Sequence, residues 1–193
     1  AVDELIIDKG SIKQVRSGDD FYSADVIISS ADYYHTETKL LSPKYRSYTE
    51  KYWDSRIMAP SCLIYYLGIG KKLDSFQHHT LFFDQDFKQH AHEIYTNPAW
   101  PENPLFYMSI TTRTDLSGAP EGCENVFLLV PVAAGIVDTD EIKEHYFNLI
   151  MDRLESSTGE DFRSFIQVKK SYAFRDFVQD YGAFKGNAYG LAN

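Results

Sequence analysis

One long amphipathic helix, predicted between runs of strand-like sequence, limits the folds that this chain can adopt. Asp138 and Glu141 form a start that resembles a capping box, and Gly159 marks the end of the helix. Apolar residues recur between them at helical spacing, at Ile142, Tyr146, Leu149, Ile150 and Leu154. Such a stripe needs an apolar partner, which neighbouring strands can supply.

Segments rich in β-branched and aromatic residues account for much of the remaining chain. Strands are predicted at residues 3–8, 11–16, 21–29, 57–67, 81–83, 105–112, 126–132 and 166–172. Shorter helices are predicted at residues 30–40, 47–53, 84–95 and 174–181, with Ser30 and Asp84 as expected caps. The run Val26-Ile27-Ile28 is typical of a strand buried on both faces. This order favours an α+β fold, in which a mixed, mostly antiparallel sheet carries helices on one face.

Composition argues against several classes of protein. Hydrophobic residues make up 44% of the chain, which is enough for a core, and the net charge of -9 argues against nucleic-acid binding. The two cysteines, Cys62 and Cys123, lie far apart and favour a reduced, cytoplasmic setting over a disulfide framework. No run reaches the roughly 18 apolar residues that a membrane-spanning helix needs.

The sequence lacks the common motifs for metal, hydrolytic and phosphate chemistry. The pairs His78-His79 and His90-x-His92 do not place two imidazoles on one helix face, so no metal site is predicted. A G-x-S-x-G sequence, typical of serine hydrolases, is not found. No catalytic acid or base can be assigned from the residues.

Residues 181–191 contain three glycines among aromatic and small residues. This segment lacks the lysine and the following helix of a phosphate-binding loop. One interpretation is a flexible loop or a helix cap. The other is a backbone that approaches a flat ligand closely, because glycine adopts positive φ at little cost.

Aromatic residues make up 15% of the chain, and many of them lie on predicted strands. Successive residues of a strand point to opposite faces, so one set can fill the core while the other lines a cavity. Ordinary packing against a helix explains about half of them on this alternation. For the rest we predict an apolar channel. Its expected lining residues are Tyr65, Phe82, Phe106, Met108 and Phe127.

Three further segments carry motifs in a fixed order along the chain. They are Ser-Ser-Ala-Asp-Tyr-Tyr-His-Thr-Glu at 29–37, Tyr-Trp-Asp-Ser-Arg-Ile-Met-Ala-Pro-Ser at 52–61 with Tyr-Tyr-Leu-Gly at 65–68, and Ala-Pro-Glu-Gly-Cys-Glu-Asn at 119–125. With the glycine-rich segment, they resemble the bacterial-type phytoene desaturase family of flavin-dependent carotenoid dehydrogenases and isomerases. The family's G-x-G-x-x-G fingerprint and its C-terminal flavin segment are not in the sequence. We therefore expect an internal part of a larger enzyme, which does not bind FAD alone.

The resemblance implies FAD as cofactor, a carotenoid or other isoprenoid hydrocarbon as substrate, and hydride transfer from a polyene C–H bond to the flavin. It implies strands of a flavin-binding domain at residues 1–30, a substrate-binding domain at 31–181 and a segment returning to the flavin domain at 182–193. The residues expected to contact the flavin are Gly186, Asn187, Ala188, Tyr189 and Gly190.

Three alternatives remain open at this point. They are a redox-neutral carotenoid isomerase of the same superfamily, an isoprenoid-binding module without chemistry, and a flavin oxidase of a small amine or alcohol. Because a carotenoid is insoluble in water, a peripheral membrane contact is also expected at residues 95–107, with Trp100 exposed in a loop. No oligomeric state is predicted.

Overall fold

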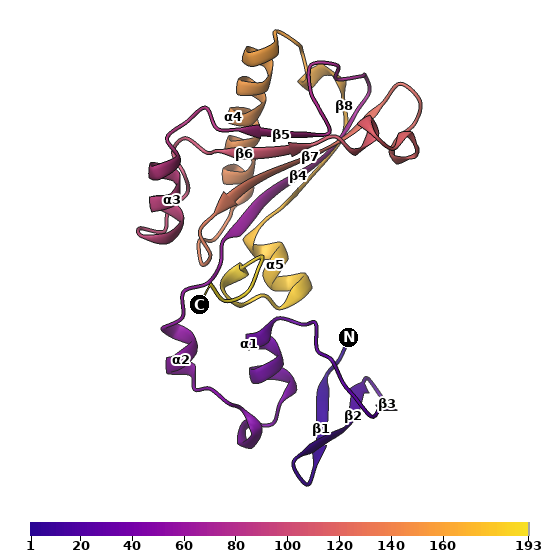
Figure 1. Cartoon of the computed structure of the whole chain (residues 1–193), viewed down its shortest axis with the longest axis vertical. Coiled ribbons are helices and arrows are strands. Elements are labelled where there is room, and N and C mark those ends of the chain that lie inside the picture. Colours follow the sequence, from indigo (N-terminus) through magenta and orange to yellow (C-terminus); the bar gives the residue numbers. More distant parts are fainter. Residues whose placement is uncertain (193) are drawn as a thin grey trace.

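The computed structural model describes residues 1–192 and contains two sheets (Figure 1). The smaller sheet consists of β1 (Glu4–Asp8), β2 (Ser11–Ser17) and β3 (Asp20–Ser23), in that order. The larger sheet has the order β5-β6-β7-β4-β8 and is formed by β4 (Ser61–Ile69), β5 (His79–Phe82), β6 (Phe106–Ser109), β7 (Glu124–Val132) and β8 (Ile166–Tyr172). Neighbouring strands of the described chain all pair antiparallel.

The helices of the described residues are α1 (Tyr33–His35), which continues as a π-helical turn at Thr36–Leu40, α2 (Glu50–Asp54), α3 (Phe87–Tyr95), α4 (Asp140–Thr158) and α5 (Phe174–Tyr181). Single turns of 3-10 helix lie at Pro43–Tyr45, Thr111–Arg113, Leu116–Gly118, Arg163–Phe165 and Phe184–Gly186. Figure 1 shows the larger sheet with α4 at one end of an elongated molecule, and the smaller sheet with α1 and α2 at the other. The predicted α+β class, with a mostly antiparallel sheet, is confirmed.

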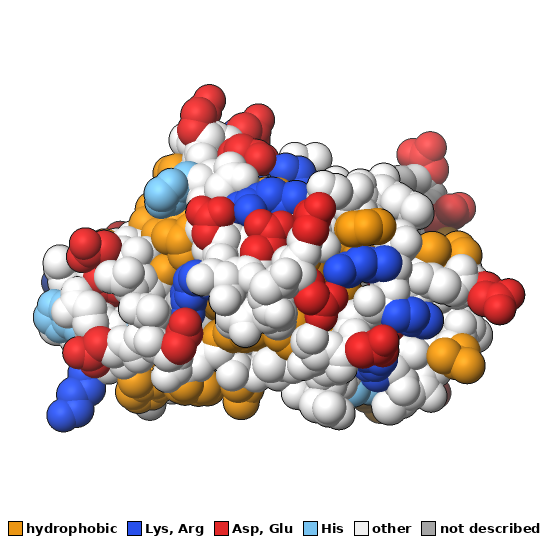
Figure 2. All heavy atoms as spheres, turned by 90° about the horizontal axis from the view of Figure 1, so that it is seen from above, with side chains coloured by type: hydrophobic (Ala, Val, Ile, Leu, Met, Phe, Trp, Pro, Cys, Tyr) orange, Lys and Arg blue, Asp and Glu red, His pale blue; other side chains and the backbone are white. Residues whose placement is uncertain are grey.

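The core lies between α4 and one face of the larger sheet. Alternate residues of β4 and β7 point toward the helix, and Leu63, Leu128 and Val130 are fully buried there. The predicted apolar stripe of α4 meets them, with Ile150 and Leu154 buried against the sheet. On the face seen in Figure 2, acidic and basic side chains are interspersed, and hydrophobic side chains show between them in several separate places.

The end of α4 was predicted correctly from the sequence, whereas its N-cap was not. Gly159 adopts a left-handed φ of 71° and ends the helix, as predicted. At the start, the side chain of Thr139, and not that of Asp138, accepts the hydrogen bond from the Ile142 N–H (3.2 Å). Asp138 is instead a buried carboxylate that links the start of α4 to α5.

Two other predicted caps are also displaced, each of these by two residues. Asp32, and not Ser30, caps α1 by accepting the His35 N–H at 3.0 Å. Asp86, and not Asp84, caps α3 by accepting the Lys88 N–H at 2.8 Å. In each case the nearby sequence offers two side chains of suitable chemistry, and only the path of the backbone selects one.

The predicted strand at residues 21–29 is wrong beyond Ser23. The Val26-Ile27-Ile28 run is not part of either sheet, and Val26 and Ile28 are 75% and 88% exposed. Its composition suits a strand with neighbours on both sides, but none of residues 1–192 pairs with it. Trp100, predicted to be exposed, is partly buried: its ring centroid lies 5.3 Å from that of Tyr146, and its Nε1–H donates to the Val137 carbonyl oxygen.

The C-terminal segment runs beside the chain that leads into β4. Gly190 O accepts the Ala59 N–H at 2.9 Å, and Pro60 O accepts the Ala188 N–H at 3.1 Å. Nearby, Trp53 is almost completely buried and its ring meets several aromatic rings edge-on. These rings belong to Tyr33, Tyr34, Tyr48, Tyr52 and Phe184. Backbone pairing and this aromatic cluster hold the two ends of the molecule together.

Asp138 provides a test of the contact between α4 and α5. Its side chain is fully buried, lies 2.9 Å from Lys143 and 3.3 Å from Arg175, and accepts the Arg175 N–H at 2.8 Å. Burial alone raises the pKa of Asp138, but the hydrogen bonds and charges of Lys143 and Arg175 hold it below its usual value. The ion pairs therefore stabilise the fold above about pH 4, and this contribution is lost as the pH falls through the lowered pKa.

We expect Asp138→Asn to lower the free energy of unfolding by about 2 kcal/mol at pH 7, because it leaves Lys143 without one buried partner. The difference from the wild type should shrink below about pH 4. Asp140→Asn is the matched control, since Asp140 pairs with the same Arg175 but its side chain is 88% exposed. Urea denaturation at several pH values measures both, and equal effects of the two substitutions would contradict the prediction.

Candidate functional site

The face of the larger sheet that points away from α4 is the main feature of the site, and we call it the open face. Strand alternation places Tyr66 of β4, Tyr107 of β6 and Leu129 of β7 on this face, opposite in parity to the core residues. Tyr66 is 45% exposed and Leu81 of β5 is 64% exposed. The sheet is therefore apolar on both faces, although α4 covers only one.

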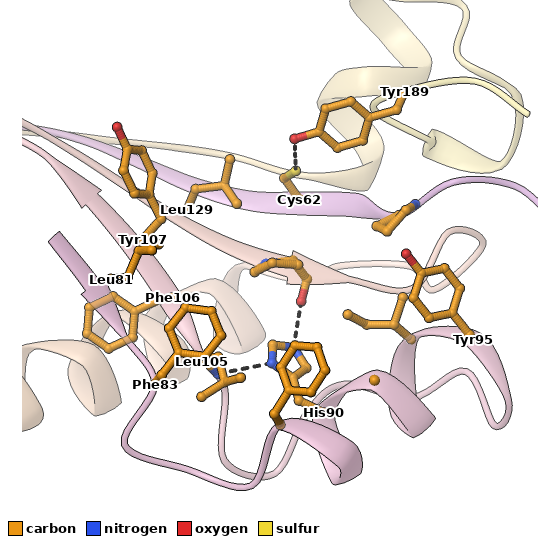
Figure 3. A pocket seen from close by; sticks show the side chains of 15 residues that line it. Cys62, Leu81, Phe83, His90, Tyr95, Leu105, Phe106, Tyr107, Leu129 and Tyr189 are labelled. Atoms are coloured by element: carbon orange, nitrogen blue, oxygen red, sulfur yellow. Dashed lines mark hydrogen bonds between the residues drawn. The ribbon is translucent and has the colours of Figure 1, made fainter. Parts of the chain in front are cut away.

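One end of the open face forms a groove against α3, with a volume of about 350 Å³. We call it the α3 groove. Its walls are mostly aliphatic and aromatic and include Leu81, Phe83, Ile94, Leu105, Leu129 and Tyr189 (Figure 3). It is suited to an apolar ligand, because such a lining offers burial and few hydrogen-bonding groups.

His90 holds the α3 wall of this groove in place. Its Nδ1 accepts the Leu105 N–H at 3.0 Å, and its Nε2 lies 2.8 Å from the Pro131 carbonyl oxygen (Figure 3). Because the Leu105 N–H can only donate, the ring is the neutral tautomer with its proton on Nε2. Both nitrogens are thus engaged by backbone, and His90 positions α3 against β7. No cluster of three metal-ligating side chains occurs within residues 1–192.

The other end of the open face forms a second groove, with a volume of about 690 Å³, between the sheet and the loop that precedes β7. We call it the loop groove. Tyr107 lines both grooves, so they meet at this residue. Phe127 and Val168 supply apolar surface, whereas Ser109 and Asn125 add neutral polar groups. The open face is therefore apolar near α3 and more polar at its far end.

A separate cleft of about 450 Å³ lies between residues 30–33 and the C-terminal segment, and we call it the C-terminal cleft. Tyr189 lines both this cleft and the α3 groove, so the two cavities share one wall. On the groove side, the Tyr189 hydroxyl lies 4.0 Å from the Cys62 thiol (Figure 3). Burial raises the pKa of Cys62 to about 11, so its thiol is neutral at physiological pH.

The glycines of the C-terminal segment have different roles. Gly186 is buried with a φ of 59°, and a Cβ there would overlap the Phe174 ring. Gly190 has a φ of 91°, and a Cβ there would meet no atom within 4 Å. Of these two glycines, Gly190 is therefore the one that combines a left-handed backbone with open space around it.

Asn187 and Asp32 fix the shape of the C-terminal cleft. The Asn187 Nδ2 donates to the Asp32 carboxylate at 3.1 Å, and its Oδ1 accepts the Gly190 N–H at 2.5 Å. Asp32 also accepts the Phe184 N–H at 3.3 Å. Asn187 is buried, so it positions the segment, whereas Ala188, Tyr189 and Gly190 border the opening.

The five residues predicted to line a channel are divided between the two faces. Tyr65 and Met108 are 1% and 0% exposed in the core, where the Tyr65 hydroxyl donates to the Lys143 carbonyl oxygen. Their assignment to a cavity was wrong, because their strand parity directs them toward α4. Phe82 and Phe106 stack at 4.2 Å, and Phe106 reaches the inner edge of the α3 groove.

Phe127 lies on the open face and lines the loop groove. Tyr107 and Leu129, which are central to the open face, were not among the residues predicted to line a cavity. Strand alternation within residues 105–112 and 126–132 separates two sets of side chains that point to opposite faces of the sheet. Because both sets are apolar, the sequence does not indicate which of them faces a cavity. Within residues 1–192, no helix has the length and apolar character needed to cross a bilayer.

Comparison with known proteins identifies the family. No family model matches the chain. It is 37% identical over 185 residues to a carotenoid 3,4-desaturase from Haloarcula japonica, covering 96% of this chain and 37% of that protein. It is 28% identical to a zeta-carotene-forming phytoene desaturase from Myxococcus xanthus, covering 99% of this chain and 37% of that protein. A lycopene-forming phytoene desaturase from Pseudescherichia vulneris is 27% identical, with 98% and 40% covered.

A solved structure supports the fold alone. The crystal structure of an oxidoreductase from Methanosarcina mazei matches with a TM-score of 0.52 and 15% identity, covering 89% of this chain and 36% of that one. The chain thus spans somewhat more than a third of the length of these relatives. The motifs that suggested the family and the similarity along nearly the whole chain agree: the chain belongs to the phytoene desaturase family of carotenoid dehydrogenases, as a part of such a protein.

Proposed function

We propose that this chain forms the substrate-binding part of a FAD-dependent carotenoid desaturase, and that the polyene lies along the open face of the larger sheet. The observation that carries the proposal is the apolar face left uncovered opposite α4, with two grooves that meet at Tyr107. From Pro131 to Asn125, β7 alone provides a track of about 20 Å for an elongated ligand. Curated relatives named as carotenoid and phytoene desaturases favour this ligand.

The lining suits a hydrocarbon because a polyene has almost no hydrogen-bonding groups. Its recognition depends on apolar burial, which contributes about 25 cal/mol per Å² before the costs of binding. The titratable groups at the end of the α3 groove are held neutral. Burial raises the pKa of Cys62, and the nearby Cys62 together with burial raises the pKa of Tyr189. A wall without charge avoids the desolvation cost that a charge would impose on hydrocarbon binding.

The C-terminal cleft has features that fit a flavin. Gly190 offers backbone without a Cβ beside open space, and residues 30–33 form the opposite side. Ala188, Tyr189 and Gly190 are the residues that would contact the ring, while Asn187 and Asp32 would hold them in position. FAD, when bound, supplies the acceptor for a hydride from the polyene. Tyr189 would then separate cofactor from substrate, since it borders both cavities.

The same proposal accounts for the outer parts of the chain. Residues 1–30 contribute strands to a flavin-binding domain, residues 31–181 bind the substrate, and residues 182–193 return toward the flavin. The exposed Val26-Ile27-Ile28 run supports this division, because its apolar character suits a strand that pairs with segments outside this chain. Residue 193 lies outside the described residues.

The direct test uses the full-length protein that contains this chain, reconstituted with FAD and supplied with phytoene in liposomes. We expect products that absorb at longer wavelength, because each desaturation extends the conjugated system. A product with the same number of double bonds but altered geometry would indicate an isomerase. Binding of the polyene without any flavin requirement would indicate a carrier, and either result would contradict the proposal.

A charge on the open face should block the polyene. In the full-length protein we expect Leu129→Asp to lower kcat/KM for the carotenoid by tenfold or more, about the effect of placing an unpaired carboxylate against hydrocarbon. Bound FAD should be unchanged. Leu116→Asp is the control, because Leu116 is 76% exposed and lines neither groove. Equal turnover by the two variants would exclude the open face as the substrate site.

A side chain at Gly190 should weaken flavin binding. We expect Gly190→Val in the full-length protein to raise the Kd for FAD by about tenfold or more, because Gly190 lines the C-terminal cleft and a valine there adds bulk at a left-handed backbone position. Gly122→Val is the matched control, since Gly122 also has a positive φ of 79° and open surroundings but lies outside this cleft. Flavin fluorescence titration measures both. Unchanged FAD affinity in Gly190→Val would place the flavin elsewhere.

A further inference from the structure

Four aromatic side chains form a row across the open face, one from each of four neighbouring strands. The ring centroid of Tyr66 of β4 lies 5.5 Å from that of Phe127 of β7, which lies 6.2 Å from that of Tyr107 of β6. The Tyr107 ring is in turn stacked 5.9 Å from the imidazole of His79 of β5. We call these four residues the aromatic row. Because each contact passes to the next strand in the order β5-β6-β7-β4, the row runs across the strands.

Tyr107 is held from two sides within this row. Its hydroxyl and His79 Nδ1 form a hydrogen bond of 2.6 Å. The His79 imidazole stacks on that of His78 at 4.1 Å, and His78 Nδ1 forms a hydrogen bond of 2.7 Å with the Thr114 hydroxyl. On its other side, the Tyr107 ring meets the Phe127 ring at an interplanar angle of 62°. The Tyr107 ring is therefore fixed, whereas an unsupported side chain keeps its rotamer freedom.

The aromatic row lies where the two grooves meet. Among the described residues, Tyr107 alone lines both grooves. Along β7, Leu129 lines the α3 groove, and Phe127 lines the loop groove. A polyene that follows β7 through both grooves therefore crosses the row.

An apolar track provides affinity but does not fix the position of a polyene along its length, which we call the register of the polyene. An isoprenoid chain repeats one unit, so a shift by one unit buries nearly the same apolar area and changes the hydrophobic free energy little. Polar contacts cannot oppose the shift, because a polyene has almost no hydrogen-bonding groups. Shape can oppose it, since packed apolar atoms tolerate neither overlap nor gaps. A fixed ring that stands across the track has such a shape, because the methyl branches of the chain fit only on either side of it.

We propose that the aromatic row sets the register of the polyene. The Tyr107 ring fits between two methyl branches, and His79 is the positioning residue that holds this ring. The register decides which carbon–carbon bond lies beside Tyr189 and the C-terminal cleft, and therefore which bond is oxidised. This inference rests on the proposed function, because it requires the polyene on the open face and the flavin in the cleft. It adds the residues that select the bond.

The test locates the first new double bond in a single turnover of the full-length protein loaded with FAD. Phytoene in liposomes is added without oxygen or another electron acceptor. Each FAD then takes up one hydride, one proton leaves the neighbouring carbon, and one double bond forms. The products are separated, and mass spectrometry determines the position of the new bond. We expect one main product from the wild type. In Tyr107→Ala, the fraction oxidised at other bonds should rise about tenfold, because the ring that opposes the shift is removed.

Two milder substitutions test the anchor of the ring. Tyr107→Phe keeps the ring but loses the hydrogen bond to His79, and His79→Ala removes the partner from an exposed position. Each should raise the fraction of displaced products about threefold, the effect of one hydrogen bond at the surface. His92→Ala is the control, because His92 is also exposed but lines neither groove, and it should give the wild-type products. Unchanged FAD content in all four variants shows that each is folded.

The position of the new bond separates this inference from a purely structural role and from the proposed function. A structural role would lower the rate and leave the position unchanged. The wild-type position in Tyr107→Ala, or in both Tyr107→Phe and His79→Ala, excludes the aromatic row as the determinant of register, while polyene binding on the open face stands. If Tyr107→Ala forms no product, the two milder variants decide. If the wild type forms no desaturated product, the proposed function and this inference are both wrong.

Discussion

The larger sheet is apolar on both faces, and one helix layer covers only one of them. Burial of Leu63, Leu128 and Ile150 between sheet and α4 supplies the hydrophobic free energy that holds this part of the molecule together. The same antiparallel pairing places Tyr107 and Leu129 on the other side, where no layer of residues 1–192 covers them. The grooves are a direct consequence, since α3 and the loop before β7 only flank this open face.

A second constraint connects the open face to the C-terminal cleft. Asp32 caps α1 and also accepts hydrogen bonds from Phe184 and Asn187, so one carboxylate orders two distant segments. Asn187 in turn holds the Gly190 N–H, and the segment pairs with the chain entering β4. Tyr189 is therefore fixed between two cavities. Charge-assisted bonds of this kind are stronger than neutral ones, which explains how a short segment is held in place.

Much of the secondary structure could be predicted because its signals are local. β8 and α5 have the predicted bounds, and Gly159 ends α4 as expected. The starts of helices were less certain, since the chosen cap depends on backbone direction among several suitable side chains. The Val26-Ile27-Ile28 run failed for a different reason: a strand forms only with hydrogen-bonded neighbours, and these are not among residues 1–192.

The sequence by itself determined that this chain has aromatic strands, one long helix to pack on them, a glycine-rich segment and the motifs of its family. Tertiary structure alone decided which side chains face the core and which face the grooves. Tyr65 and Met108 were placed on the wrong side because their neighbours Tyr66 and Tyr107 are equally suited to either face. Hydrophobic burial does not distinguish two apolar sets one residue apart. The register of β4, β6 and β7 and the docking of α4 make that choice.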